Sequence, residues 1–331
     1  MDTPVQELIS LSSPELWKSR LKELPHQFGH TWEHCQAMHL STGQPTYLYY
    51  FKVAGHTILC PISERTYQGH TDIVTPYGFN GFITNGDYQL FNIHWKKFMK
   101  SKGYVCGYFG LNPLWPHDLG FPANEINVYS EIHELNLTQP LQTLISQMSE
   151  NRKRQLKKME RIRNNLSMDK EKLTGFFLEQ YENFIQAKSA SRVYHFSTSA
   201  LKLLVEQDNV FMTGYIDNEK VEAVSVFGYT NYAADFLFNV NTVYGKETSF
   251  ALIWMAIEKL KSMNIPLLNL GGGVKNGDAL SAFKKRFGGE IKSLASVQQV
   301  YDPEVFQQLC IESGVDMNQK GYFPPYRLKT H

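Results

Sequence analysis

A lysine that directly follows a phenylalanine, shortly after three adjacent glycines, is the clearest candidate for chemistry in this sequence. The stretch NLGGGVKNGDALSAFKKRFGG contains, in order, Gly271, Gly272, Gly273, Phe283 and Lys284. When an amine attacks a thioester or an ester, negative charge develops on the carbonyl oxygen, and a lysine ammonium or backbone N–H groups can stabilise it. We therefore expect Lys284 to act in acyl transfer, with the glycine backbone as its helper. The alternative is a tight turn followed by a solvated basic helix.

Two carboxylates are candidates for the general base, because an attacking amine must also lose a proton. Asp235 lies in a predicted strand, and Asp278 lies in the glycine loop. Each has an alternative role as an ordinary turn or surface carboxylate, since most aspartates are exposed.

Two further segments are candidates for binding an acceptor. The loop TPYGFNGFITN carries Tyr77, Gly78 and Phe79, whose two rings could form a stacking wall for a sugar or a nucleotide. Alternatively, both rings fold into the core. The segment SASRVYHF carries Arg192 and Tyr194 between two predicted helices, where an arginine can clamp a phosphate or a carboxylate with two hydrogen bonds. The alternative for Arg192 is an ordinary surface ion pair.

A strongly basic helix is predicted in the middle of the chain, over residues 151–165. Its sequence has seven lysines and arginines against a single glutamate, and three apolar residues at a spacing of three, Leu156, Met159 and Ile162. This pattern is typical of a packed helix with a solvated basic side, on which we expect Arg152 to lie. The alternative is a helix that binds a polyanion through its phosphates.

Composition and cysteine spacing exclude several classes of protein. The formal net charge is +1, so no overall field attracts nucleic acid or an anionic membrane. The four cysteines are far apart, and no Cys or His pair has the spacing of metal ligands. We therefore expect no metal, reduced thiols and a cytoplasmic protein. The N-terminal stretch is not apolar enough for a signal peptide, and we expect no membrane span.

The elements that must position these residues follow an α+β order. With 331 residues the chain is long enough for two domains, which we predict at 1–150 and 151–331. Hydrophobic periodicity and turn residues predict helical structure over 14–38, 88–102, 141–165, 172–187, 199–206 and 248–262. The same signals predict strands over 46–53, 56–62, 104–111, 127–135, 210–216, 221–229, 232–239, 267–270 and 297–301.

Four of these segments, taken together, give the chain a resemblance to a known family. TPYGFNGF, NRKRQLKKMER, ASRVYHF and NLGGGVKNGDALSAFKKRFGG occur in the order and at the distances found in the FemABX-related acyltransferases. That resemblance implies two tandem GNAT-like domains with mixed central sheets. It also implies that the family's Phe-Lys pair corresponds to Phe283 and Lys284, with the lysine in the acyl-transfer site.

The resemblance further implies N-acyl transfer to an amino sugar, a nucleotide sugar or another amine-bearing cell-envelope precursor. An acyl-CoA donor is the expected cofactor, with Gly245 and Lys246 in NTVYGKETS as binding residues beside the three glycines. That segment departs from the family's Q/R-x-x-G-x-G/A loop. An aminoacyl-tRNA donor is the alternative, and the chain lacks the heptad pattern of the helical arm found in peptidoglycan members. A non-catalytic double GNAT-like protein that holds RNA or another polyanion is the other alternative.

Overall fold

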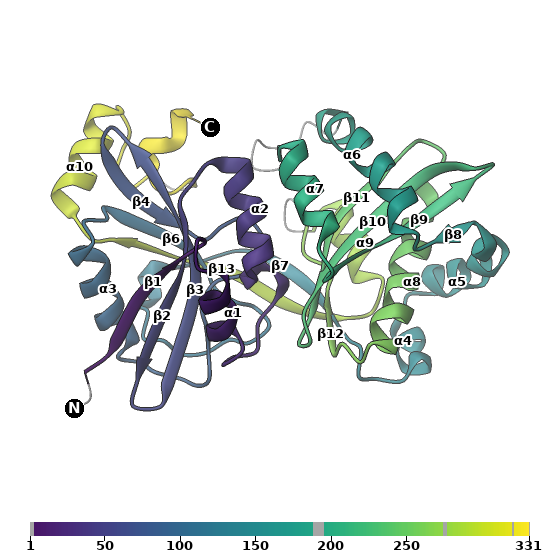
Figure 1. Cartoon of the computed structure of the whole chain (residues 1–331), viewed down its shortest axis with the longest axis horizontal. Coiled ribbons are helices and arrows are strands. Elements are labelled where there is room, and N and C mark those ends of the chain that lie inside the picture. Colours follow the sequence, from purple (N-terminus) through teal and green to yellow (C-terminus); the bar gives the residue numbers. More distant parts are fainter. Residues whose placement is uncertain (1–2, 188–194, 274–276, 320, 331) are drawn as a thin grey trace. The chain divides into compact units, whose positions relative to one another are not determined.

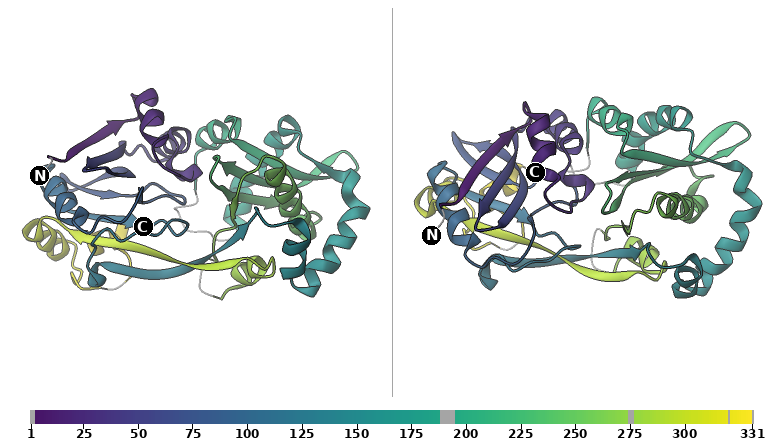
Figure 2. Two further views of the ribbon diagram at one scale, coloured as in Figure 1. Left: turned by 90° about the horizontal axis from the view of Figure 1, so that it is seen from below. Right: turned by 60° about the horizontal axis from the view of Figure 1, so that its bottom comes forward.

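The chain divides into two compact units, shown in a computed structural model that describes residues 3–187, 195–273, 277–319 and 321–330 (Figure 1). Unit 1 comprises residues 1–25, 29–129 and 294–331, and unit 2 comprises residues 26–28 and 130–293. These bounds differ from the predicted domains 1–150 and 151–331, because the chain passes from one unit to the other within two strands. The two strands, β7 (Ile126–Asn136) and β13 (Glu290–Val300), run side by side (Figure 2).

Unit 1 is built on a mixed sheet whose strands follow the order β1-β2-β3-β4-β6-β13, with β5 beside β3. The first four strands form an antiparallel meander, β4 and β6 are parallel, and β13 is antiparallel to β6. The strands are β1 (Val5–Ser10), β2 (Thr46–Val53), β3 (His56–Tyr67), β4 (His70–Val74), β5 (Ile83–Thr84) and β6 (Cys106–Gly110). The helices are α1 (Pro14–Leu21), α2 (Trp32–Thr42), α3 (Phe91–Ser101) and α10 (Pro303–Glu312).

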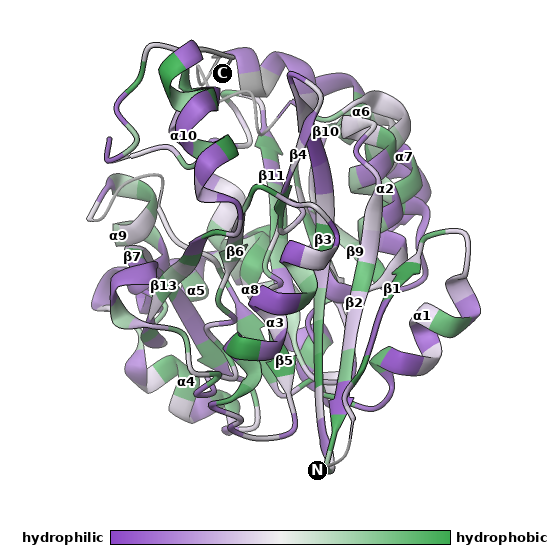
Figure 3. Ribbon diagram, turned by 90° about the vertical axis from the view of Figure 1, so that its left-hand side faces the viewer, coloured by the Kyte–Doolittle hydropathy of each residue, from purple (hydrophilic) through white to green (hydrophobic). Residues whose placement is uncertain are grey.

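The run of aromatic residues in β2 is buried because both faces of this strand are covered by other elements. Side chains alternate between the two faces of a strand. Tyr49 and Phe51 accordingly lie in one core cluster with Trp95 of α3, whereas Leu48 and Tyr50 lie in another that includes residues of α1 and α2. Buried residues therefore follow one another along β2 and most of β3 instead of alternating with exposed ones, and the apolar part of β3 is green in Figure 3.

The strands of unit 2 follow the order β7-β12-β11-β10-β9-β8, with β13 next to β7. β11 and β12 are parallel, and the other neighbours among these six strands are antiparallel. The remaining strands are β8 (Leu166–Ser167), β9 (Val210–Asp217), β10 (Lys220–Tyr229), β11 (Ala234–Asn241) and β12 (Leu267–Asn269). The helices are α4 (Leu141–Gln147), α5 (Glu150–Ile162), α6 (Lys170–Ala187), α7 (Thr198–Glu206), α8 (Ser249–Ser262) and α9 (Ala279–Lys285).

A bulge in β11 directs its phenylalanines to different parts of unit 2. The register with β10 shifts between Val226 and Phe227, so Leu237 has no partner on that strand. An extra residue reverses the alternation of side chains beyond it. Phe238 consequently contacts Phe177 of α6, whereas Phe236 packs against the core cluster that contains α8.

Most predicted elements are confirmed, although the helical segments predicted over 14–38 and 141–165 each form two helices. Residues 14–38 form two helices instead of one helical segment, and α1 ends at Leu21, shortly before Pro25. The strands β1, β4, β5 and β8 and the helix α10 were not predicted. The predicted basic segment, residues 151–165, lies mostly in α5, and α5 packs on α8 within unit 2.

Candidate functional site

The three glycines lie where the chain leaves β12 and runs beside β7 in unit 2. Leu270 N donates to His133 O (2.9 Å), and His133 N donates to Gly271 O (3.2 Å). Gly271 has φ +72°, a conformation that favours glycine. At Gly272 a Cβ atom would lie 2.1 Å from the carbonyl oxygen of Glu131. Close packing against β7 thus accounts for glycine at this position.

The short helix α9 turns Lys284 inward and leaves its neighbour in solvent. Asp278 begins the helix as its N-cap, with Oδ1 accepting from Ser281 N at 2.8 Å. Ser281 and Lys284 are three residues apart, so they share one helix face, and both are buried. Lys285 is exposed, as the helical periodicity predicts.

Lys284 carries a buried amino group that contacts the glycine loop directly. Its side chain donates from Nζ to Gly272 O at 2.7 Å, and Nζ lies 5.8 Å from the centre of the Phe236 ring. Only 7% of the residue is exposed. Burial lowers the pKa of Lys284 to about 8, and the charge of Asp278 opposes this shift. The ammonium has three N–H donors, and Gly272 O accepts one of them.

Two residues of β7 join this site, and sequence reasoning missed both. Ser281 Oγ donates to Glu131 Oε1 (2.9 Å) and lies 3.1 Å from Nε2 of His133, which is fully buried. The pKa of His133 is lowered chiefly by burial, against the opposing charge of Glu131. The available signal was strand alternation, since Glu131 and His133 are two residues apart in a predicted strand and therefore share a face.

Asp235 is buried and supports the start of the glycine loop. Its Oδ1 accepts from Gln27 Nε2 (2.8 Å) and Asn269 Nδ2 (3.0 Å), and Asn269 Oδ1 accepts from Gly271 N (2.8 Å). Burial raises the pKa of Asp235 to about 7, whereas hydrogen bonds from Asn269, Gln27 and Phe28 N oppose the rise. Lys284 therefore contacts Gly272 directly, and Asp235 acts on the neighbouring Gly271 through Asn269.

The residues predicted for acyl-CoA lie ahead of α8 in unit 2. Gly245 precedes a 3₁₀ turn over Lys246–Thr248, and a Cβ atom on it would lie 2.1 Å from Glu222 O. Lys246 is exposed. Close packing explains the glycine, and the binding role of both residues stays a prediction.

The predicted aromatic wall belongs to unit 1. His34 is buried, which lowers its pKa to about 4, and its neutral ring donates from Nε2 to Tyr77 O at 2.6 Å. Gly78 has φ +117°, and a Cβ atom there would lie 2.8 Å from His34 Nε2. Tyr77 is 38% exposed and Phe79 is half-buried, so these rings are not both folded into the core. The other predicted acceptor residues, Arg192 and Tyr194, lie outside the described residues.

The expectation that Arg152 is solvated is wrong, because the residue is 3% exposed. The guanidinium carbon of Arg152 lies 4.2 Å from the centre of the Phe283 ring, and Nη2 donates to Phe283 O at 3.2 Å. The exposed side of α5 carries other cations instead, namely Arg154, Lys157, Lys158 and Arg161.

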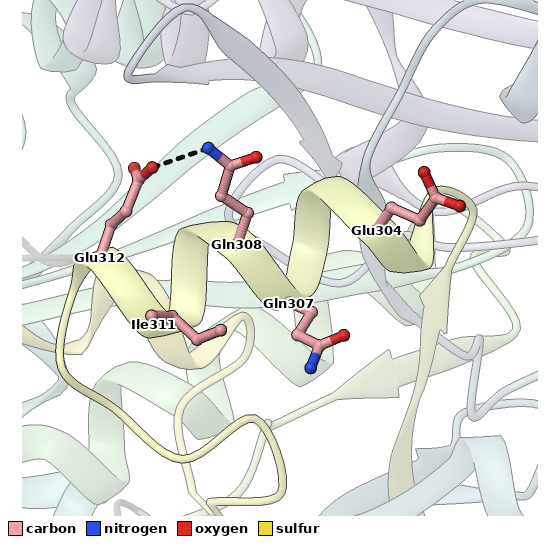
Figure 4. A pocket seen from close by; sticks show the side chains of 5 residues that line it. All are labelled: Glu304, Gln307, Gln308, Ile311 and Glu312. Atoms are coloured by element: carbon pink, nitrogen blue, oxygen red, sulfur yellow. Dashed lines mark hydrogen bonds between the residues drawn. The ribbon is translucent and has the colours of Figure 1, made fainter.

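The described chain also contains a surface hollow and four cysteines away from the glycine loop. Within the described residues, no cluster of metal-ligating side chains occurs, and no helix is long and apolar enough to cross a membrane. The four cysteines are buried and free. A surface hollow in unit 1 is lined by side chains of α10 alone, where Gln308 donates to Glu312 at 2.8 Å (Figure 4).

Comparisons with solved structures show the fold. The structure of FemX superposes with a TM-score of 0.66 at 9% identity, over 92% of this chain and 99% of that one. L-PGS from Bacillus licheniformis matches with a TM-score of 0.54 at 10% identity, over 86% and 91%. The C-terminal domain of a putative lysylphosphatidylglycerol synthetase from Agrobacterium fabrum matches with a TM-score of 0.52 at 10% identity, over 94% and 100%. No family model and no curated protein sequence matches this chain.

Proposed function

We propose that this protein, which has the GNAT-like acyltransferase fold seen in FemX, is an N-acyltransferase. The donor is an acyl-CoA-type thioester, and the acceptor is an amino group of an amino sugar or another cell-envelope precursor. The observation that carries this proposal is Lys284, whose buried amino group is hydrogen-bonded to the glycine loop through Gly272 O. A buried cation is costly unless it is paired, so its presence calls for a reason.

In the proposed reaction the acceptor nitrogen attacks the acyl carbonyl carbon. A C–N bond forms, the C–S bond breaks, the thiol leaves, and the attacking amine gives up one proton. Lys284 is the donor that stabilises the oxyanion. A preorganised ammonium in a site with little water interacts more strongly with the oxyanion than an ammonium in bulk solvent does. The backbone N–H groups of Gly272 and Gly273 make no hydrogen bond to another described residue, which supports a helping role.

Of the two predicted bases, Asp235 is the better candidate. Its pKa of about 7 matches what general-base catalysis needs near neutral pH. The side chain of Asp278 is already engaged as the N-cap of α9. We therefore propose Asp235 as the proton acceptor and assign Asp278 to holding the helix that carries Lys284.

A thiol-release assay tests the donor class. Purified protein is incubated with a panel of acyl-CoA thioesters, with and without amino-sugar acceptors, and compared with the Lys284→Met variant. We expect release that requires both an acceptor and Lys284. Release that is equal in the two proteins would place the chemistry elsewhere, and transfer only from an aminoacyl-tRNA would replace the donor.

A second candidate function, binding of RNA or another polyanion, rests on the exposed side of α5. Arg154, Lys157, Lys158 and Arg161 follow the spacing of one helix face, and none forms an ion pair with another described residue. Their neighbours Lys153 and Arg163, by contrast, pair with glutamates. An aminoacyl-tRNA donor, as in a Fem-type peptidyltransferase, would also use such a surface.

Filter binding of tRNA as a function of salt separates this function from binding of a small neutral acceptor. Each phosphate contact contributes roughly 0.7 to 0.9 to the negative slope of log affinity against log salt. Replacing Lys157 and Lys158 with glutamate should therefore reduce the slope by about 1 to 2. Lys202→Glu, exposed on α7 of the same unit, is the control. Equal slopes for all three proteins would remove this candidate.

A further inference from the structure

We propose that Arg152 of α5 is a positioning residue, which holds α9 at the place where the Lys284 amino group meets the glycine loop. The inference rests on the proposed function of Lys284 and adds a residue to it.

Arg152 contacts α9 at Phe283, the residue just before Lys284. Its Nη2 donates to the Phe283 carbonyl at 3.2 Å, and the guanidinium carbon lies 4.2 Å from the centre of the Phe283 ring. The same carbon lies 5.3 Å from the ring centre of Phe250 and 5.2 Å from that of Phe287. Gln155, one turn further along α5, accepts from Nη1. One side chain thus contacts both the backbone and the ring of Phe283.

The geometry suits arginine and no other side chain. The last four carbonyls of a helix lack N–H donors within the helix, and a cation near them also interacts favourably with the helix dipole. Phe283 O is one of these carbonyls, since α9 ends at Lys285. A planar guanidinium can stack on aromatic rings and donate in its own plane at the same time, which a lysine ammonium cannot do.

Burial of this cation is costly, and the described residues do not offset the cost with a carboxylate. Arg152 is 3% exposed, forms no ion pair with a described residue, and its Nε has no hydrogen-bond partner. Burial, with the nearby charge of Arg286, lowers the pKa of Arg152 to about 10. An apolar side chain of similar volume often replaces a buried charge without loss of stability. The hydrogen bond to α9 is therefore the contribution that an apolar residue could not make.

The position of α9 matters because the helix is short and, among the described residues, the Lys284 amino group is hydrogen-bonded to Gly272 O alone. The N-terminal end is fixed by the Asp278 cap and by Ser281, which bonds to β7. The C-terminal end is fixed from the α5 side by Arg152 and by Ser149 N, which donates to Arg286 O at 3.1 Å. A helix rises about 1.5 Å per residue, so a shift of one residue would separate Lys284 Nζ from Gly272 O.

The test measures the amino group of Lys284 directly in Arg152→Met, which keeps apolar contact with the rings and removes the donors. Lysines are acylated with trace acetic anhydride from pH 6 to 11, and the rate at each lysine is read by mass spectrometry. The charged groups near the site, Asp278 at the start of α9 and Glu131 on β7, are unchanged. We expect the midpoint for Lys284 to rise by roughly one pH unit or more toward that of an ordinary lysine, as burial is lost.

Lys285 serves as the internal control, and Arg154→Met, two residues along α5 and exposed, is the matched variant. The profile of Lys285 should be the same in every protein, and Arg154→Met should leave the Lys284 profile unchanged. A folded Arg152→Met protein with a wild-type Lys284 profile would overturn the proposal. If that variant does not fold, Arg152→Lys decides by the same measurement, because it keeps the charge and lacks the planar fork. The labelling is a chemical reaction that does not depend on enzymatic turnover, so a wild-type turnover in Lys284→Met would refute the proposed function without affecting this result.

Discussion

Lys284 and Lys285 are neighbours in sequence with opposite environments, and the contrast makes them a matched pair. The first is buried against Gly272 O and the second is exposed. Adjacent residues of a helix point about 100° apart, so this part of the site was predictable from the sequence. The burial of Asp235 was not, because it depends on Gln27, which is distant in the chain.

For catalysis, we expect Lys284→Met to lower turnover by roughly 100-fold or more, as is usual when one electrostatic donor to the transition state is lost. Lys285→Met should stay within a few-fold of wild type, because exposed positions tolerate substitution. Since the protonated form acts and its pKa is about 8, the Lys284-dependent rate should fall as pH rises through that value. Steady-state thiol release for both variants, with thermal melts, checks this. Equal rates would exclude Lys284.

For stability, Asp235 gives a prediction about pH. Its folded pKa of about 7 lies above the ordinary value of 3.8, so the native state holds a proton that the unfolded chain has released. The stability that Asp235 contributes is therefore present at low pH and is lost as pH rises from about 4 to 7. The side chain of Asp235→Asn cannot ionise. The difference in the free energy of unfolding between wild type and this variant should therefore shift in favour of the variant by on the order of 2 to 4 kcal/mol between pH 4.5 and pH 8.

Urea unfolding of Asp235→Asn at the two pH values measures this difference. Asp217→Asn, an exposed carboxylate at the end of β9 in the same unit, is the control and should show little pH dependence. A difference from wild type that stays constant with pH would contradict the burial of a titrating Asp235.

At the scale of elements, hydrophobic periodicity was enough to predict most strands and the helix α8, because each buries a regular face. It was not enough for β1, which is only partly buried and pairs with β2 at the edge of its sheet. The order of strands also could not be read from the sequence. Pairing of β6 with β13, and of β7 with β12, joins segments that lie far apart along the chain.

The contact between the glycine loop and β7 predicts the effect of one methyl group. In Gly272→Ala the new Cβ atom would lie 2.1 Å from Glu131 O, a backbone atom that cannot rotate away. We expect the loop to move off β7, with a loss of about 1 to 3 kcal/mol in stability and about 100-fold in turnover. Gly175→Ala, in α6 where a Cβ atom meets nothing within 4 Å, should be neutral or stabilising. Wild-type turnover in Gly272→Ala would mean that the loop position does not matter.

At the scale of the whole molecule, unit 1 depends on both ends of the chain. In its core, Trp95 donates to the Tyr301 hydroxyl at 3.0 Å, and Phe306 and Leu309 of α10 pack with Val105 and Cys106. Asp72 adds a buried polar link, since Tyr326 and Arg327 both donate to its Oδ2. The N-terminal segment alone therefore lacks part of its own core.

We expect a fragment of residues 1–150 to lack a cooperative thermal transition, because it leaves β6 without its β13 partner and removes α10. Circular dichroism melts and size-exclusion chromatography check this. The full chain and a fragment of residues 130–293 are the comparisons, and the latter contains nearly all of unit 2. A sharp melt of fragment 1–150 would instead support the domain boundary predicted from the sequence.

The two crossings of the chain in β7 and β13 also fix an order of events during synthesis. Unit 2 has all its residues once position 293 has left the ribosome, whereas unit 1 must wait for residues 294–331. Domains usually fold in the order in which they are made, N-terminal first, at about 5–20 residues per second of synthesis. Here the segment made first is completed last. While unit 2 is being translated, the β6 strand presents an open edge, and a nascent chain in that state is the form of this protein most exposed to chaperones and to aggregation.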